Sequence, residues 1–298
     1  MADELGGAFA VRQVPAARDT VLNELRDAAV VFDASMKVRF DRTMIDAAPG
    51  LQLVITATTG ADHIDSSALA ARGIPLLTLK TEREFLRGIT PAAELSWLLL
   101  LACARRFRAA VRHVEQGGWD REQFPGTMLR GRTLGLIGCG RIGGWMARYA
   151  RAFDMTVLGH DPFLSEFPAE VKAVGLPELL ASADFVSIHV HYSEATRGLL
   201  GARELALMQD GAVLINTSRG AIVDEAALLA GLAAGKPAGL GVDVVEGEPD
   251  IRSTRLWQYA QTHDNVIITP HIGGFSPDAL ASVLRHTARR IRGHFAKA

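Results

Sequence analysis

Short apolar runs alternate with amphipathic helical patterns along almost the whole chain. In the first 80 residues, the runs that predict strands are bounded by turn residues and lie at 9–14, 29–32, 51–56 and 74–79. The helical patterns between them lie at 17–28, 41–48 and 65–72. Asp41 is a predicted N-cap of the second of these helices. Strand–helix alternation on this scale predicts a parallel sheet whose faces are covered by helices.

One continuous helical pattern then runs from Thr90 to about Gly117, with Pro91 in its first turn. At 1.5 Å per residue this helix would be roughly 40 Å long, which suits a bridge between two lobes. Its longest apolar run, 95–103, is far below the roughly 18 residues that span a bilayer, so it predicts a core helix. The basic second half, 105–113, is more typical of a solvated face than of a binding surface.

The alternation continues to the end of the chain. Further strands are predicted at 134–137, 156–160, 185–189, 212–216, 238–245 and 266–269, before a closing helix at 277–295. A chain of 298 residues is long enough for two domains, each with its own core. The pattern therefore predicts an α/β protein with two doubly wound parallel-sheet lobes.

A glycine pattern joins the strand at 134–137 to the next helix. The spacing Gly138-x-Gly140-x-x-Gly143 has a physical cause at each position. The first glycine permits a tight turn, the second lets the backbone approach a pyrophosphate, and the third allows helix and strand to pack closely. Amides at the start of the helix then face the phosphates. The pattern predicts a Rossmann dinucleotide-binding domain.

The end of the following strand indicates which dinucleotide is preferred. Asp161 lies about 20 residues beyond the first glycine, where a carboxylate binds the ribose hydroxyls of NAD. No Arg or Lys lies between Asp161 and Glu170 to bind a 2′-phosphate. We therefore expect NAD rather than NADP.

Composition excludes several other classes of protein. A formal net charge of −1 gives no electrostatic basis for binding nucleic acid or an anionic membrane. Cys103 and Cys139 lie in apolar or glycine-rich segments, so they are expected to be free thiols of a cytoplasmic protein rather than a disulfide or a metal site. The first residues lack the pattern of a signal peptide.

Three polar residues follow later strands of the nucleotide-binding unit. His271 can transfer a proton near neutral pH, Glu248 can orient its ring, and Arg219 can bind an anionic group. With a hydride from a nicotinamide, this set suits reduction of a 2-oxo acid. Each residue alone has a simpler interpretation: a surface charge, a solvated loop and a turn residue. Their shared location at the carboxyl ends of strands favours the catalytic interpretation.

These motifs resemble the D-isomer-specific 2-hydroxyacid dehydrogenases, in particular the phosphoglycerate dehydrogenase-like members. The resemblance covers about 29–298 and is strongest at 138–143, 215–224, 243–249 and 269–274. It implies that Arg219, Glu248 and His271 are the catalytic Arg, Glu and His. It also implies a Rossmann NAD-binding domain at 105–274 and a smaller flavodoxin-like substrate (lid) domain at 1–104 with 275–298. The first strand–helix unit of the usual substrate domain is expected to be missing.

The resemblance also implies contacts with ligands and a homodimer formed through the cofactor domains. The predicted cofactor-binding residues are Gly138, Gly140, Arg141, Ile142, Gly143, Asp161, Pro162, His189, Val190, Thr217, Ser218, Asp243, Gly273 and Gly274. The predicted substrate-binding residues are Thr58, Thr59, Gly60 and Lys80, besides Arg219 and His271.

The identity of the substrate stays open at this point. One hypothesis is that Lys80, Arg83 or Arg87 binds a second anionic group, such as a phosphate or phosphonate. A solvated face is the simpler interpretation, because Glu82 and Glu84 neutralise the run. The leading function is an NAD-dependent 2-oxo acid reductase. An NAD(H)-sensing corepressor-type protein is the alternative, and a methyltransferase is a distant third.

Overall fold

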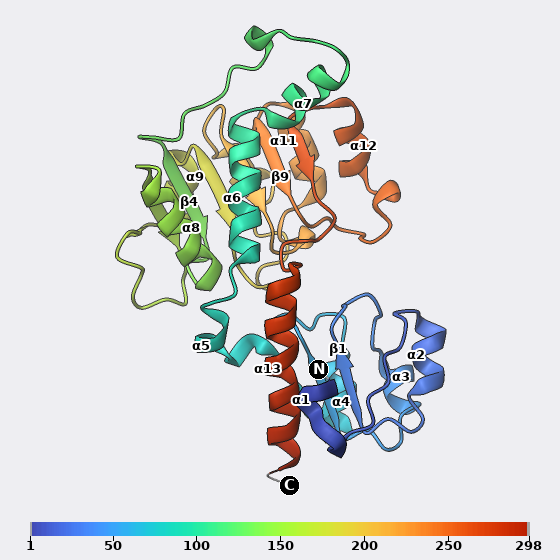
Figure 1. The fold of residues 1–298 in the computed structure, drawn as a ribbon. Coiled ribbons are helices and arrows are strands. Elements are labelled where there is room, and N and C mark those ends of the chain that lie inside the picture. The colour runs from blue at the N-terminus through green and yellow to red at the C-terminus, as the bar shows by residue number, and fades with distance from the viewer. Residues whose placement is uncertain (1, 297–298) are drawn as a thin grey trace. The chain divides into compact units, whose positions relative to one another are not determined.

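The computed structural model describes residues 2–296, which divide into two units (Figure 1). Residues up to 89, together with those from 276 onward, form the smaller unit, and 90–275 form the larger one. The boundary predicted after residue 104 is therefore displaced. Helix α6 (Pro91–Ala104) belongs to the larger unit because its apolar side chains, including Trp97 and Leu100, are buried in that unit's core.

The larger unit is built on a seven-stranded parallel sheet. Its strands are β4 (Thr133–Ile137), β5 (Thr156–His160), β6 (Lys172–Ala173), β7 (Phe185–Ile188), β8 (Val213–Asn216), β9 (Gly239–Val242) and β10 (Val266–Ile268). Their order is β10-β9-β8-β7-β4-β5-β6. The chain runs outward from β4 to β6, returns to β7 on the other side of β4, and then proceeds to β10. This reversal confirms the doubly wound Rossmann arrangement.

Helices cover both faces of this sheet. On one face lie α6 and α8 (Arg141–Ala152), and Figure 1 shows α6 crossing the strands on the near side. The other face packs against α9 (Leu176–Ser182), α10 (Ala202–Ala206), α11 (Glu225–Ala233) and α12 (Arg255–Thr262). Because both faces are covered, the central strands are almost continuously apolar.

The smaller unit contains a three-stranded parallel sheet in the order β1-β2-β3. Its strands are β1 (Val30–Asp33), β2 (Leu53–Thr56) and β3 (Leu76–Leu77). One face packs against α2 (Arg18–Glu24), α3 (Arg42–Asp46) and α4 (Ser66–Ala71), and the other against α1 (Ala2–Leu5) and α13 (Pro277–Phe295). The strands follow chain order, so these three show no reversal of the kind that a flavodoxin-like order has.

The N-terminal caps of two helices in this unit use carboxylates. The Asp41 side chain accepts a hydrogen bond from the Met44 amide, which confirms the predicted cap of α3. Asp65 caps α4 in the same way through the Ala68 amide. These caps end the extended segments before the helices and set where each helix begins.

Two predicted elements are wrong. Residues 9–14 form no strand; their side chains are mostly exposed, so the alternating pattern there has no sheet face to cover. The predicted long helix is divided into two helices, α6 and α7 (Phe107–Glu115), because Arg106 adopts a left-handed backbone conformation with φ of 50°.

The basic side chains of α7 are not simply solvated. Arg108 donates to the carbonyls of Ala260 and Val266.

Residues 83–104 have the length and hydropathy of a membrane-crossing helix by composition alone. Their backbone is interrupted, however, between α5 (Arg83–Leu86) and α6. Alone, α6 has 14 residues and is about 21 Å long, shorter than a hydrocarbon core of roughly 30 Å. Its burial in the larger unit confirms the predicted core helix. The remaining short helices are η1 (Gly6–Ala8), η2 (Leu79–Thr81), η3 (Arg121–Gln123), η4 (Gly220–Ile222) and η5 (Ile251–Ser253).

Candidate cofactor and active site

The ends of six strands meet at one edge of the large sheet. Their pairing shows this directly, because Ile137 pairs with both His160 and Ile188, and Asn216 pairs with Val242. The predicted cofactor residues of β4, β5, β7, β8 and β9 begin immediately after these strands, and Gly273 and Gly274 follow a few residues after β10. Carboxyl edges of this kind, at a reversal of strand order, are where ligands bind in open parallel sheets.

The turn after β4 requires its glycines for separate reasons. Gly138 has a φ of 92°, and a Cβ there would lie 2.5 Å from the His189 carbonyl oxygen. A Cβ on Gly143 would overlap the carbonyl oxygen of Gly138. At Gly140, in contrast, no protein atom of the described chain lies within 4 Å of the Cβ position outside its immediate neighbours. Space is therefore open beside Gly140, which is the N-cap of α8, as the predicted approach of a pyrophosphate requires.

Asp161 links the next strand to this turn. Its Oδ2 accepts a hydrogen bond from the Cys139 amide at 3.0 Å, and its Oδ1 accepts one from the Phe163 amide at 3.1 Å. The carboxylate is therefore held at the carboxyl end of β5, beside the glycine turn. This is the location that the sequence predicts for a ribose-binding acid.

His189 and Val190 follow β7 and lie against the glycine turn. The His189 ring shares a hydrogen bond of 2.8 Å with the hydroxyl of buried Ser187, and burial lowers the pKa of His189 to about 3. The ring is therefore neutral at physiological pH. The backbone of His189 packs against Gly138 of the turn. A contact between its backbone and a cofactor is compatible with this arrangement.

The backbone after β8 is held by hydrogen bonds to the side chain of Asn216, a residue that the sequence analysis does not single out. Asn216 is 2 % exposed, and its side chain donates to the Arg219 carbonyl at 2.9 Å and accepts from the Ser218 amide at 3.0 Å. The Ser218 hydroxyl donates to the Ile188 carbonyl at 2.8 Å. These bonds fix the backbone of the predicted residues Thr217, Ser218 and Arg219. The sequence signal for this role is the position of Asn216, a polar residue at the end of the otherwise apolar strand β8.

His271 and Glu248 form a direct pair although they lie on separate loops. The distance between His271 Nδ1 and Glu248 Oε1 is 2.6 Å, and the two side chains are 37 % and 35 % exposed. The hydrogen bond that His271 donates to the Glu248 carboxylate is the main reason that the pKa of His271 is raised, although burial and the charge of Arg219 act in the opposite direction. The arrangement favours a protonated imidazole beside an arginine, which suits proton transfer to an anionic substrate.

In the smaller unit, the predicted residues Thr58 and Gly60 lie in one turn. The Thr58 hydroxyl donates to the Gly60 carbonyl at 2.6 Å and is 2.7 Å from the hydroxyl of buried Thr56. Thr59 lies between them. Lys80 is an exposed residue of η2, in the segment that follows β3.

Glu82 does not neutralise the nearby basic residues as the sequence suggested. Its carboxylate instead pairs with His286 and Arg290 of α13, at 2.9 and 3.3 Å. The side chains of Lys80, Arg83 and Arg87 are exposed. The carboxylate of Glu82 is therefore directed at α13.

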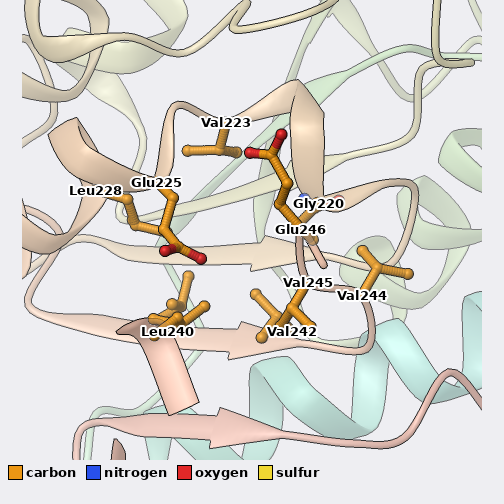
Figure 2. Close-up of a pocket in the computed structure, with 11 residues that line it drawn as sticks. Gly220, Val223, Glu225, Leu228, Leu240, Val242, Val244, Val245 and Glu246 are labelled. Carbon is orange, nitrogen blue, oxygen red and sulfur yellow. The ribbon is translucent and has the colours of Figure 1, made fainter. Parts of the chain in front are cut away.

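Figure 2 shows a small, largely apolar pocket whose lining includes Gly220 and Glu246. It is lined by residues of β9, η4 and α11, and the carboxylates of Glu225 and Glu246 face it. Burial, together with the charge of Glu246, raises the pKa of Glu225. A Cβ on Gly220 would overlap the backbone of Val245 and Glu246, so the two loops are packed directly against each other.

The fold and this set of residues define a dinucleotide-binding protein of the two-unit α/β class. Residues 97–273 match the family model described as D-isomer specific 2-hydroxyacid dehydrogenase, NAD binding domain, and residues 3–81 match the catalytic domain of the same family. The chain belongs to the D-isomer specific 2-hydroxyacid dehydrogenase family. Its cofactor is NAD, and the matched range includes all the predicted cofactor residues except Gly274.

Several relatives illustrate the breadth of the family. The chain is 39 % identical over 258 residues to D-3-phosphoglycerate dehydrogenase of Archaeoglobus fulgidus, covering 86 % of this chain and 47 % of that protein. It is 36 % identical to hydroxypyruvate reductase of Thermotoga maritima, covering 84 % and 79 %. The structure of D-lactate dehydrogenase from Aquifex aeolicus, complexed with NAD and lactic acid, superposes with a TM-score of 0.82 at 29 % identity, covering 93 % and 85 %. The chain spans about half the length of the phosphoglycerate dehydrogenases that it matches.

Proposed function

We propose that the protein is an NAD-dependent dehydrogenase that interconverts a 2-oxo acid and a D-2-hydroxy acid. One observation carries this proposal: the His271–Glu248 pair, 2.6 Å apart, lies with Arg219 among the loops at the carboxyl edge of the sheet that bears the NAD fingerprint. NAD, when bound, supplies or accepts the hydride. Membership of the family supports the same reaction class.

Each polar residue has a separate role in the proposed reaction. The Arg219 guanidinium binds the substrate carboxylate as a fixed charged fork. His271, protonated, donates a proton from Nε2 to the carbonyl oxygen during reduction and accepts it during oxidation. Glu248 stabilises the imidazolium through Nδ1. We include Thr58, Thr59, Gly60 and Lys80 as substrate contacts in the same proposal.

The test is NADH oxidation, followed by absorbance, against a panel of 2-oxo acids. We expect turnover with at least one of them, and loss of about three orders of magnitude in kcat for His271→Gln. NADH binding, measured by quenching of protein fluorescence, should persist in that variant. Wild-type turnover that survives this substitution would refute the assigned acid–base role.

The second candidate, an NAD(H)-sensing corepressor-type protein, is distinguished by the same assay. It requires NADH binding without turnover of any 2-oxo acid. Tight NADH binding with no turnover across the panel would favour the sensor.

We further propose that the substrate carries a second anionic group, such as phosphate or phosphonate, bound by Lys80, Arg83 or Arg87. The exposure of Lys80 and Arg83, and the pairing of Glu82 with α13, support this proposal. The name of the Archaeoglobus relative is consistent with such a substrate. Phosphorylated and plain 2-oxo acids are compared by kcat/KM in wild type and in Arg83→Gln. Equal efficiency for the two substrates would refute the proposal.

We also propose a homodimer formed through the larger unit. Its supporting observation is a set of large apolar side chains exposed on α6, α7 and the segment that follows. These are Leu98, Phe107, Val114, Trp119 and Met128, with Trp119 90 % exposed. Light scattering on the purified protein should give twice the chain mass of 32.0 kDa. A monomer at micromolar concentration would contradict the proposal.

A further inference from the structure

The Asp243 carboxylate binds three donors from the loop that carries His271. Asp243 follows β9 and is 1 % exposed. Its Oδ1 accepts from the Thr269 hydroxyl at 2.5 Å and from the Ile272 amide at 2.9 Å, and its Oδ2 accepts from the Gly273 amide at 2.7 Å. A buried carboxylate satisfied in this way fixes the backbone on both sides of His271.

The backbone of His271 needs such support. Its φ is 54°, in the left-handed region that residues with a Cβ rarely adopt unless their surroundings hold them there. The His271 amide donates to the backbone carbonyl oxygen of Asp243 at 3.0 Å. Asp243 therefore binds this loop through both its side chain and its backbone. The direction in which the imidazole leaves the backbone is thereby set by Asp243.

The geometry leaves room for a second contact by the same residue. A carboxylate offers about four acceptor positions, and the three donors leave one of them on Oδ2. The predicted cofactor role of Asp243 is compatible with this remaining position. The three hydrogen bonds that the Asp243 carboxylate accepts from the described residues, however, all come from the loop of His271.

We propose that Asp243 is a positioning residue for His271, acting through the hydrogen bonds that hold residues 269–273, and that this role is separate from any contact with NAD. The inference rests on the proposed function for the chemical role of His271. The consequence is that His271 Nδ1 meets Glu248 only while Asp243 holds the loop. Weakening the bonds at Asp243 should therefore loosen the His271–Glu248 pair at a distance.

Two substitutions separate positioning from charge. Asp243→Asn keeps the shape but turns an acceptor into a donor that faces the loop amides. Thr269→Val removes one hydrogen bond to Asp243 and alters no charge, and Thr269→Ser restores the hydroxyl. Asp210→Asn is the matched control for charge loss, because Asp210 is a surface residue with a 90 % exposed side chain.

The decisive measurement is made on the His271 ring itself. Nitrogen chemical shifts of ¹⁵N-histidine-labelled protein are followed against pH, and the His271 signals are identified by their loss in His271→Gln. The charged groups that act on this ring are Glu248, Arg219 and Asp243. In Thr269→Val these charges are unchanged, so any displacement of the titration midpoint reports geometry.

We expect Thr269→Val to move the His271 midpoint toward lower pH and to lower kcat about tenfold. Asp243→Asn should lower kcat about a hundredfold, as expected for misplacement of a reacting group. Thr269→Ser and Asp210→Asn should resemble wild type in both readouts. Dissociation constants for NADH are measured alongside.

The opposite pattern overturns the inference. If Asp243→Asn and Thr269→Val leave the His271 shifts and midpoint unchanged and only weaken NADH binding, Asp243 is a cofactor contact alone. Should Asp243→Asn fail to fold, Thr269→Val decides. If wild type shows no turnover, the proposed function fails, while the ring titration still tests the positioning role because it requires no catalysis.

Discussion

Replacing Glu248 with Gln tests the acid–base pair most directly. The substitution keeps the size of the side chain and removes the charge 2.6 Å from His271 Nδ1. The hydrogen bond that His271 donates to Glu248 is the main cause of the raised pKa of His271. The variant should therefore have a lower pKa at that imidazole.

The magnitude follows from the strength and exposure of the pair. A hydrogen bond to a charged group contributes about 1.5–3 kcal/mol, and the lower end applies because both side chains are more than a third exposed. About 1.5 kcal/mol corresponds to a loss of roughly tenfold in kcat/KM for reduction at neutral pH. The loss should diminish at lower pH, where His271 is protonated without help.

The assay is the pH profile of kcat/KM for reduction of the best 2-oxo acid. Reduction needs protonated His271, so the profile falls as pH rises through the pKa of that residue. In Glu248→Gln this descending limb should move to lower pH, whereas Asp250→Asn, an exposed residue of the same loop, should keep the wild-type limb. An unchanged limb in Glu248→Gln, with any loss of rate uniform across pH, would refute the reasoning.

Three further predictions address other parts of the site. Asp161→Ser should raise the KM for NADH about tenfold and reduce the preference for NADH over NADPH. The variant loses both the carboxylate predicted to bind the ribose and the hydrogen bond from the Cys139 amide, and steady-state kinetics with the two cofactors check this. Gly220→Ala should lower kcat by at least tenfold, since a Cβ there overlaps the backbone of Val245 and displaces the Glu248 loop; unchanged kcat would contradict it. Glu225→Gln should raise Tm at pH 8 but not at pH 4, because a carboxyl with a raised folded-state pKa weakens the fold once pH exceeds that pKa; equal shifts in Tm at both values would count against it.

The parts of this fold that could be predicted from the sequence are those set by local pattern. The glycine turn and Asp161 lie in one strand–turn–helix–strand segment, where spacing alone fixes geometry. The proximity of Glu248 and His271 could be predicted because parallel strands bring their carboxyl ends to one edge. The end of α6 was missed because a single left-handed residue, Arg106, interrupts a continuous helical pattern.

Contacts between distant segments could not be predicted in the same way. The sequence predicts that Glu82 neutralises its basic neighbours, yet its partner His286 is 204 positions away on α13. The failed strand at 9–14 has the same origin, because alternation predicts a strand only if a neighbouring strand exists to pair with it. Residues whose role depends on a partner far along the chain are therefore the ones that require a structure.

The proposed reacting groups differ from the glycine turn in how they are held, and this has a consequence for the proposed reaction. The glycine turn is set mainly by its backbone geometry, with one hydrogen bond from the Cys139 amide to the side chain of Asp161. His271 is held by hydrogen bonds between its own loop after β10, which begins with Thr269, and the loop after β9, which carries Asp243 and Glu248; several of these bonds involve side chains. Substitutions around the sheet edge should therefore reduce proton transfer before they reduce NAD binding. A scan of these loops in which kcat and the dissociation constant for NADH fell together would show that the two functions are not separable in this way.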